Sequence, residues 1–195
     1  MYSIITGGEN MKIKKMLALP LAVSLLSSAM ISKKVFATNQ DFIIDNDPVA
    51  IGFSGSCSPN MVYYSGMTGS YYDDMRMSSS SMVGTFYKWH YPPVNFNKTY
   101  GSLSLVVYLN NINFTDPYAG YFAENYYGGG DDAGTYLTVG YLNQNTAPSG
   151  WSPTINCNMY SYAGSNIISS RIYVNQSSSN YNCLGADAIH PYFYY

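Results

Sequence analysis

The stretch Gly101-Ser-Leu-Ser-Leu-Val-Val-Tyr-Leu109 decides the fold class of this 195-residue chain. Every second residue from Leu103 to Leu109 is aliphatic, and Ser102, Ser104 and Tyr108 lie on the other face of the same alternation. Because successive side chains of a strand point to opposite faces, this period of two predicts a strand with one buried face. After Thr38, no stretch keeps a 3.6-residue apolar period over three turns, so helices are not expected.

The same alternation recurs elsewhere in the chain. Tyr87, Trp89 and Tyr91 alternate with Phe86, Lys88 and His90, and similar patterns run through 137–141 and 168–174. Turn signals such as Pro92-Pro93 separate these runs. Candidate strands lie near 41–46, 50–55, 70–77, 82–91, 101–110, 119–126, 134–143, 154–162, 167–174 and 185–194. Such a series predicts an all-β fold, a jelly-roll β-sandwich.

The first 37 residues resemble a secretory signal peptide. A basic segment at 12–15 precedes an apolar run from Met16 to Ile31, and Val35-Phe36-Ala37 suits cleavage after Ala37. The alternative is a membrane anchor, for which the run is short against the roughly 20 residues of a spanning helix. Met11 is a better start than Met1. We therefore predict a signal peptide at 1–37 and one secreted domain at 38–195 that does not span a membrane after cleavage.

Removal of this leader changes the charge balance. Residues 38–195 keep four basic and ten acidic side chains, a net charge of −6. This balance argues against nucleic acid as a partner, because such binding needs a basic surface. The sequence leaves the oligomeric state open.

Three cysteines remain: Cys57, Cys157 and Cys183. In an exported protein we expect one disulfide and one free thiol, with three possible pairings. The alternative is three free thiols. No Cys-x-x-Cys spacing is present, so a zinc site is not expected.

Several local patterns, taken in order, resemble the golvesin-like domain, also called the xanthan lyase carbohydrate-binding-like domain. The resemblance covers roughly 41–194, and Asp73 departs from it by replacing a glycine. The matching segments are Ile43–Asp47 with Gly52-Phe53, Tyr71–Arg76, Phe86–Trp89, Tyr100–Tyr108, Gln144 with Gly150-Trp151, and Ala186–Ile189. The resemblance implies a galactose-binding-like jelly roll, a non-catalytic accessory role, and a structural hydrogen-bonding role for Asp187 near the first strand.

The 22 tyrosines are the richest functional signal. Sugar rings lie flat on aromatic faces, while neighbouring polar groups bind their hydroxyls. The alternative is that the two tryptophans, Trp89 and Trp151, belong to the core. The expected ligand-binding residues are Tyr71, Tyr72, Asp73, Arg76, Tyr126, Gln144 and Trp151.

Catalysis is not expected, and neither is a catalytic cofactor. The segment Gly52–Ser56 only approaches a nucleophile elbow, since Ser56 replaces its last glycine. His90 and His190 are read as half-exposed strand residues. Asp73 and Asp74 are sequence neighbours that a strand would point to opposite faces, so they cannot flank one glycosidic bond.

A structural calcium ion is a further expectation from hard oxygen ligands. The candidate ligands are Asp45, Asp47, Asp131 and Asp132. The alternative is that they are solvated turn residues.

The sequence thus predicts a secreted, non-catalytic module that binds extracellular polysaccharide or cell-wall glycan. A structural or self-associating matrix protein is the second hypothesis, favoured by the uncharged Tyr192–Tyr195 end. A hydrolase is the third.

Overall fold

The computed structural model describes residues 40–47, 50–78, 84–125, 135–146, 149–161, 164–176 and 183–195. All of them belong to one compact unit, Thr38–Tyr195. The predicted leader, its cleavage site, Tyr126, Asp131 and Asp132 lie outside the described residues. No helix in the described ranges is long and apolar enough to cross a membrane.

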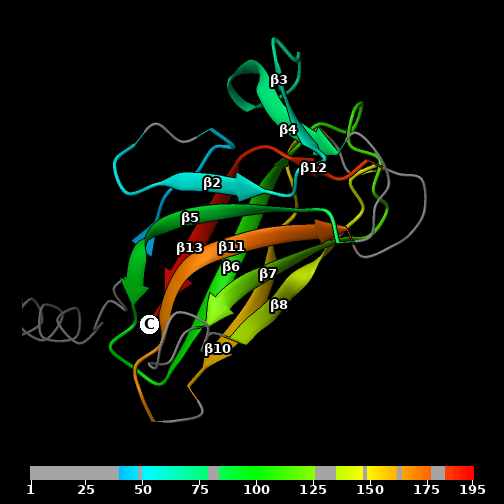
Figure 1. Ribbon diagram of the computed structural model, residues 1–195. Helices are drawn as coiled ribbons and strands as arrows, with labels where there is room; N and C mark the ends of the chain where they lie inside the picture. Colours follow the sequence, from blue (N-terminus) through cyan, green and yellow to red (C-terminus); the bar gives the residue numbers. More distant parts are fainter. Residues whose placement is uncertain are drawn as a thin grey trace, which may run out of the picture. The chain divides into compact units, whose positions relative to one another are not determined.

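The chain forms antiparallel sheets, as predicted (Figure 1). The first, sheet A, has the order β1 (Gln40–Asp41), β13 (Ile189–Tyr194), β6 (Tyr100–Leu109) and β10 (Ile155–Tyr160), and β9 (Gly150–Trp151) also pairs with β6. The second, sheet B, has the order β2 (Ser54–Cys57), β5 (Phe86–Asn95), β11 (Ile168–Gln176), β7 (Ala119–Asn125) and β8 (Thr135–Leu142).

A smaller, three-stranded sheet lies at the upper end of the view in Figure 1. Its order is β12 (Gly185–Ala186), β4 (Asp74–Ser78) and β3 (Met61–Ser65), and a 3₁₀ turn, η1 (Tyr71–Asp73), leads into β4. The chain passes repeatedly from one sheet to another, and the predicted all-β sandwich is confirmed.

The core lies on the inner faces of the alternating strands. On β6 the residues from Leu103 to Leu109 are buried at every second position, and on β5 Tyr87, Trp89 and Tyr91 are buried. These side chains belong to one continuous hydrophobic cluster. The period of two therefore predicted both strands and their buried faces correctly.

Trp89 is a core residue, as the alternative interpretation held. Its side chain is fully buried and meets the Tyr87 ring edge-on at a centroid distance of 4.8 Å. The indole Nε1–H donates a hydrogen bond of 3.1 Å to the carbonyl oxygen of Asp187. A buried indole thus obtains the partner that its N–H needs.

The prediction that Pro92-Pro93 ends a strand is wrong. Both prolines lie inside β5, although neither can donate a ladder hydrogen bond. The register with β11 shifts between Ser169 and Arg171, opposite the prolines, and pairing with β2 ends at His90. A bulge combined with a free edge is where a strand accommodates proline.

Four other expected strands differ from the structure. The segment near 41–46 supplies only β1 and one isolated bridge, Ile44 to Ile189, and the strand near 50–55 begins at Ser54 instead. The segment 70–77 begins as the turn η1, and β3 was not predicted. The strand expected at 185–194 is interrupted at Asp187-Ala188.

The expected disulfide does not form. Cys57, Cys157 and Cys183 are all free thiols, which agrees with the alternative interpretation. Burial raises the pKa of the Cys157 thiol to about 11, so this side chain is a weak nucleophile at neutral pH.

We predict that Trp89→Ala lowers the free energy of unfolding by about 3–5 kcal/mol, because it removes a fully buried ring and leaves a cavity. Urea unfolding followed by circular dichroism measures this loss. Tyr194→Ala is the control, since this half-exposed side chain near the end of β13 should cost less than about 1 kcal/mol. Equal losses in the two variants would contradict the core assignment.

Candidate functional site

Five side chains form a continuous line of rings, called here the aromatic row: Tyr72, Tyr71, Trp151, His190 and Tyr192. Consecutive ring centroids lie 4.4, 5.5, 6.0 and 4.1 Å apart. The turn η1 supplies the first two rings, β9 the third and β13 the last two. Segments far apart in sequence thus meet in one aromatic surface.

Strand pairing explains how the aromatic row forms on the outer face of sheet A. His190 and Tyr192 alternate with the buried residues of β13, so they point outward. Trp151 pairs with Tyr108 of β6, whose ring contacts both Trp151 (5.2 Å) and Tyr71 (5.4 Å). Paired residues of antiparallel strands share a face, so Tyr108 supports the aromatic row from β6.

Polar side chains lie beside the aromatic row on the same face. Ser104 is paired with Tyr192 on one side and with Asn156 on the other. The ring of His190 is held by Asp41, whose Oδ2 is 3.1 Å from Nε2, and by the Tyr192 hydroxyl, 2.9 Å from Nδ1. The surface therefore combines flat apolar rings with hydrogen-bonding groups.

The turn η1 holds Tyr72 in an unusual backbone conformation. Tyr72 (φ 52°) and Asp73 (φ 60°) both lie in the left-handed region, which is rare for a bulky side chain. The Tyr72 side chain is 78% exposed. Backbone strain that serves an exposed ring, and not the core, is characteristic of binding surfaces.

Asp187 anchors η1 from inside the protein. Its buried carboxylate accepts the Tyr71 N–H at Oδ2, with a distance of 3.0 Å. The family resemblance implied a structural hydrogen-bonding role for Asp187 near the first strand, and the hydrogen bond observed here is to the Tyr71 N–H of η1. It fixes the position of the first two rings of the aromatic row.

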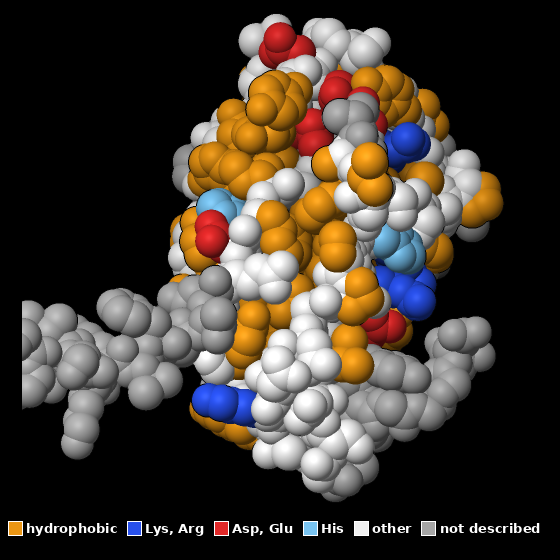
Figure 2. Space-filling view, turned by 90° about the vertical axis from the view of Figure 1, so that its left-hand side faces the viewer, with side chains coloured by type: hydrophobic (Ala, Val, Ile, Leu, Met, Phe, Trp, Pro, Cys, Tyr) orange, Lys and Arg blue, Asp and Glu red, His pale blue; other side chains and the backbone are white. Residues whose placement is uncertain are grey.

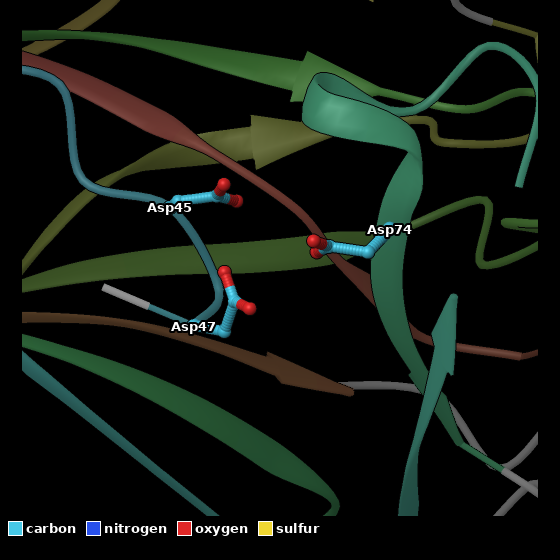
Figure 3. Close-up of side chains that lie close together, drawn as sticks. All are labelled: Asp45, Asp47 and Asp74. Atoms are coloured by element: carbon cyan, nitrogen blue, oxygen red, sulfur yellow. The ribbon is translucent and has the colours of Figure 1, made fainter. Parts of the chain in front are cut away.

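An acidic pocket of about 350 Å³ lies next to η1. Asp45 and Asp47 follow β1, Asp74 begins β4, and carboxylate oxygens of the three lie within 4.8 Å of one another (Figure 3). Tyr72 lines the same pocket, together with Ile43, Ala50 and Phe53. Acidic side chains also gather at this upper end in the space-filling view, with hydrophobic ones beside them (Figure 2).

Burial changes the protonation of these carboxyl groups. It raises the pKa of Asp45 to about 6, with the charges of Asp74 and Asp47 adding to the shift. Burial also raises the pKa of Asp187 to about 8, to which the charges of Asp45 and Asp74 contribute. Near neutral pH, the Asp187 carboxyl therefore keeps a proton that it can donate, whereas Asp45 is mostly ionised and accepts hydrogen bonds.

The structure brings together three of the predicted ligand-binding residues, Tyr71, Tyr72 and Trp151. Asp73 is exposed beside them. Arg76 lies on β4 with its guanidinium 5.3 Å from the centre of the Tyr63 ring, outside the aromatic row. Tyr126 lies outside the described residues.

Gln144 is placed inside the fold and not at the surface. Its side chain is fully buried. Nε2 donates to the Tyr121 hydroxyl and to the Gly185 carbonyl, and Oε1 accepts the Gly185 N–H, each at 2.9 Å. These bonds connect Gln144 to β7 and β12, so we assign it a structural role in place of the expected ligand contact.

Tyr108, His190, Tyr192 and Asp74 belong to the site but were not predicted as members of it. A signal for the two β13 residues was available, because they occupy the outward positions of a period-two pattern. Asp74 was considered only together with Asp73. Nothing local in the sequence indicates that Asp74 meets Asp45 and Asp47.

A second aromatic surface lies on the outer face of sheet B. Phe122 stacks on its cross-strand partner Tyr173 at 4.9 Å, and Tyr136 meets Tyr173 edge-on at 4.7 Å. The Lys88 ammonium is 4.9 Å from the centre of the Phe86 ring. We call these five residues the sheet B platform. The period-two alternation of each strand predicts that these five side chains point outward, but it does not predict that the rings stack.

No catalytic triad is assembled around either histidine in the described part of the chain. Ser56 Oγ and His90 Nε2 are 2.8 Å apart, but no carboxylate forms a hydrogen bond to the His90 ring. The nearby Glu124 instead contacts Arg171 and Ser170. The His190 ring contacts Asp41 and Tyr192, and no described serine or cysteine forms a hydrogen bond to it.

Comparison with known proteins yields structural likenesses only. No family model and no curated protein matches the chain. A CBM35 module from Cellvibrio japonicus Abf62 is similar with a TM-score of 0.46 and 15% identity, over 78% of this chain and 92% of that one. A xylan-binding CBM22-2 domain from Paenibacillus barcinonensis Xyn10C gives 0.43 and 13%, over 76% and 97%.

The chain also matches a xanthan lyase from Paenibacillus, with a TM-score of 0.45 and 15% identity over 77% of this chain. It spans only 13% of the length of that lyase. At these values the likenesses do not carry a functional argument, which therefore rests on the residues of this chain.

We predict that the metal-free protein becomes less stable as pH rises from about 4 to 8. The pKa of Asp187 is near 8 in the folded state and near 3.8 in the unfolded state, so the folded protein binds the extra proton and loses stability when it is released. Asp187→Asn keeps an acceptor for Tyr71 and removes the charge. It should raise the free energy of unfolding at pH 8 by about 1–3 kcal/mol.

Urea unfolding of both proteins at pH 4, 6 and 8, with a chelator present, measures this effect. The difference between the variant and the wild type should grow with pH. A difference that is constant across the three pH values would contradict the assignment of a buried, titrating Asp187.

Proposed function

We propose that this protein is a secreted, non-catalytic module that binds extracellular polysaccharide or cell-wall glycan, and that it is related to the golvesin-like domains. The observation that carries this proposal is the aromatic row. Five rings follow one another in contact, two on η1 and three on the outer face of sheet A, and such a series suits a chain of sugar units.

The exposed rings supply the stacking contacts. Tyr72 is 78% exposed and Trp151 is 38% exposed, and both rings contact the less exposed Tyr71. Sugar C–H groups pack on such faces, and the strained backbone of η1 holds the Tyr72 ring ready before the ligand arrives. Preorganisation of this kind lowers the entropic cost of binding.

Hydrogen-bonding groups at both ends of the aromatic row complement the stacking. The carboxyl groups around Tyr72 accept or donate, depending on their protonation, whereas Ser104 and Asn156 lie near Tyr192. Sugar hydroxyls are both donors and acceptors, so they match this mixture. The four basic residues of the mature chain provide little attraction for polyanions.

The sheet B platform supports a second candidate function, self-association. Its rings Phe122, Tyr136 and Tyr173 contact one another on an outward sheet face. Exposed apolar surface of this kind also occurs at contacts between protein molecules. The two functions use different faces, so separate variants distinguish them.

We expect the protein to be retained on at least one of peptidoglycan sacculi, xylan and xanthan in pull-down and affinity electrophoresis. Tyr72→Ala and Trp151→Ala should each weaken retention about tenfold, because each removes a stacking contact worth on the order of 1 kcal/mol. Tyr136→Ala on the sheet B platform is the matched control and should leave retention unchanged.

Absence of retention on any of the three matrices, or equal effects of the variants on both sheets, would count against glycan binding by the aromatic row. Sedimentation of the same proteins tests the second function. Concentration-dependent oligomers that Tyr136→Ala dissociates, and Trp151→Ala does not, would favour self-association through sheet B.

A further inference from the structure

The acidic pocket has a geometry that glycan stacking does not require. Asp45 and Asp47 come from the segment after β1, and Asp74 comes from the start of β4. Figure 3 shows the three carboxylates pointing toward a common space between these two segments. At least one oxygen of each lies within 4.8 Å of the others.

A second feature, the side chain of Asn46, points to a ligand in the same space. Asn46 is 1% exposed, and its amide is inserted between two of the carboxylates. Nδ2 donates to Asp74 Oδ1 at 2.5 Å and to Asp45 Oδ1 at 3.3 Å. The other end of the amide, Oδ1, is buried without a hydrogen-bond partner.

A buried amide oxygen without a partner is costly, and such atoms often indicate a bound ion or water. Rotation of the amide by 180° exchanges its oxygen and nitrogen, which would turn Oδ1 toward the carboxylates. That orientation is unfavourable beside three anionic groups alone, and favourable when a cation lies among them. The Asn46 side chain therefore fits a fourth ligand.

The three carboxylates have little counter-charge from the described basic side chains. Among the described residues, no Lys or Arg forms an ion pair with Asp45, Asp47 or Asp74. The closest basic residue in sequence, Arg76, places its guanidinium over the rings of Tyr63 and Tyr87 instead. Burial and the charge of Asp47 raise the pKa of Asp74, and they outweigh the charge of Arg76, which lowers it.

We propose that Asp45, Asp47 and Asp74, with the Asn46 amide oxygen, bind a calcium ion. All four donors are hard oxygen atoms, which calcium prefers. Calcium–oxygen distances of about 2.3–2.6 Å allow ligands around one ion to lie up to about 5 Å apart, and the observed spacing of 4.8 Å or less fits that range. The site extends the sequence-based expectation of calcium by adding Asp74, whereas Asp131 and Asp132 lie outside the described residues.

The bound ion connects two segments that no strand pairing joins directly. One is the segment after β1, and the other is the start of β4, which follows η1. Since Tyr72 lines the same pocket, the ion fastens the turn that carries the first rings of the aromatic row. The site is thus structural, and it does not depend on the identity of any glycan.

Calcium titration of the chelator-treated protein by calorimetry tests the proposal. We expect one ion per chain and a rise in melting temperature of roughly 5–10 °C at a hundredfold excess over the dissociation constant. Magnesium should bind at least tenfold more weakly, because it demands shorter, octahedral coordination. Terbium should report the same site by luminescence sensitised by Tyr72 and be displaced by calcium.

Asp47→Asn and Asp74→Asn should each weaken calcium binding at least tenfold. Both variants should still fold without metal, because each relieves repulsion between carboxylates, and far-ultraviolet circular dichroism verifies this. Asp73→Asn is the matched control: it changes an adjacent carboxylate outside the cluster, and asparagine tolerates the left-handed backbone there. The control should keep the wild-type affinity for calcium.

Absence of calcium heat and of any rise in melting temperature would overturn the proposal. So would calcium binding that survives in the folded Asp47→Asn and Asp74→Asn variants. Failure of the glycan proposal can be distinguished from this result, because retention on sacculi, xylan or xanthan is measured both with and without calcium.

Discussion

The buried group Asp187 connects the core of this protein to its candidate binding surface. Its backbone carbonyl accepts the indole N–H of Trp89, and its carboxylate accepts the N–H of Tyr71. The first bond holds Asp187, which lies between β12 and β13, against Trp89 of sheet B. The second holds the turn η1, so the position of the aromatic row depends on a polar residue inside the fold.

The surface at η1 concentrates features that are costly for stability alone. Tyr72 and Asp73 adopt left-handed backbone conformations, Tyr72 is largely exposed, and carboxylates crowd the adjoining pocket. Elsewhere on the sandwich, alternation buries apolar side chains and exposes polar ones. Such a local concentration of strain and charge is the physical reason for proposing that ligand binds at this end of the protein.

Period-two alternation was sufficient to predict strands β5 and β6 and their buried faces, because side-chain direction in a strand is a local property. On β11 it predicted the buried Ile172 and Val174, but the bulge after Ser169 reverses the alternation, so Ser169 is buried and Ile168 is only partly buried. The aromatic motifs also identified Tyr71, Tyr72 and Trp151. By contrast, the bulge that accommodates Pro92-Pro93, the burial of Gln144 and the approach of Asp74 to Asp45 depend on pairing between distant segments. No local pattern encodes those contacts, and for the same reason the free state of the three cysteines did not follow from their number.

The central claim is that glycan binds along the aromatic row, and the two tryptophans test it within a single spectrum. Proton–nitrogen NMR resolves the indole N–H of Trp151 on the aromatic row from that of Trp89, which is bonded to Asp187 in the core. During titration with an oligosaccharide from the retaining matrix, we expect the Trp151 signal to shift saturably and the Trp89 signal to stay in place. A Trp151 signal that does not move at saturation, while backbone signals of sheet B do, would contradict the claim.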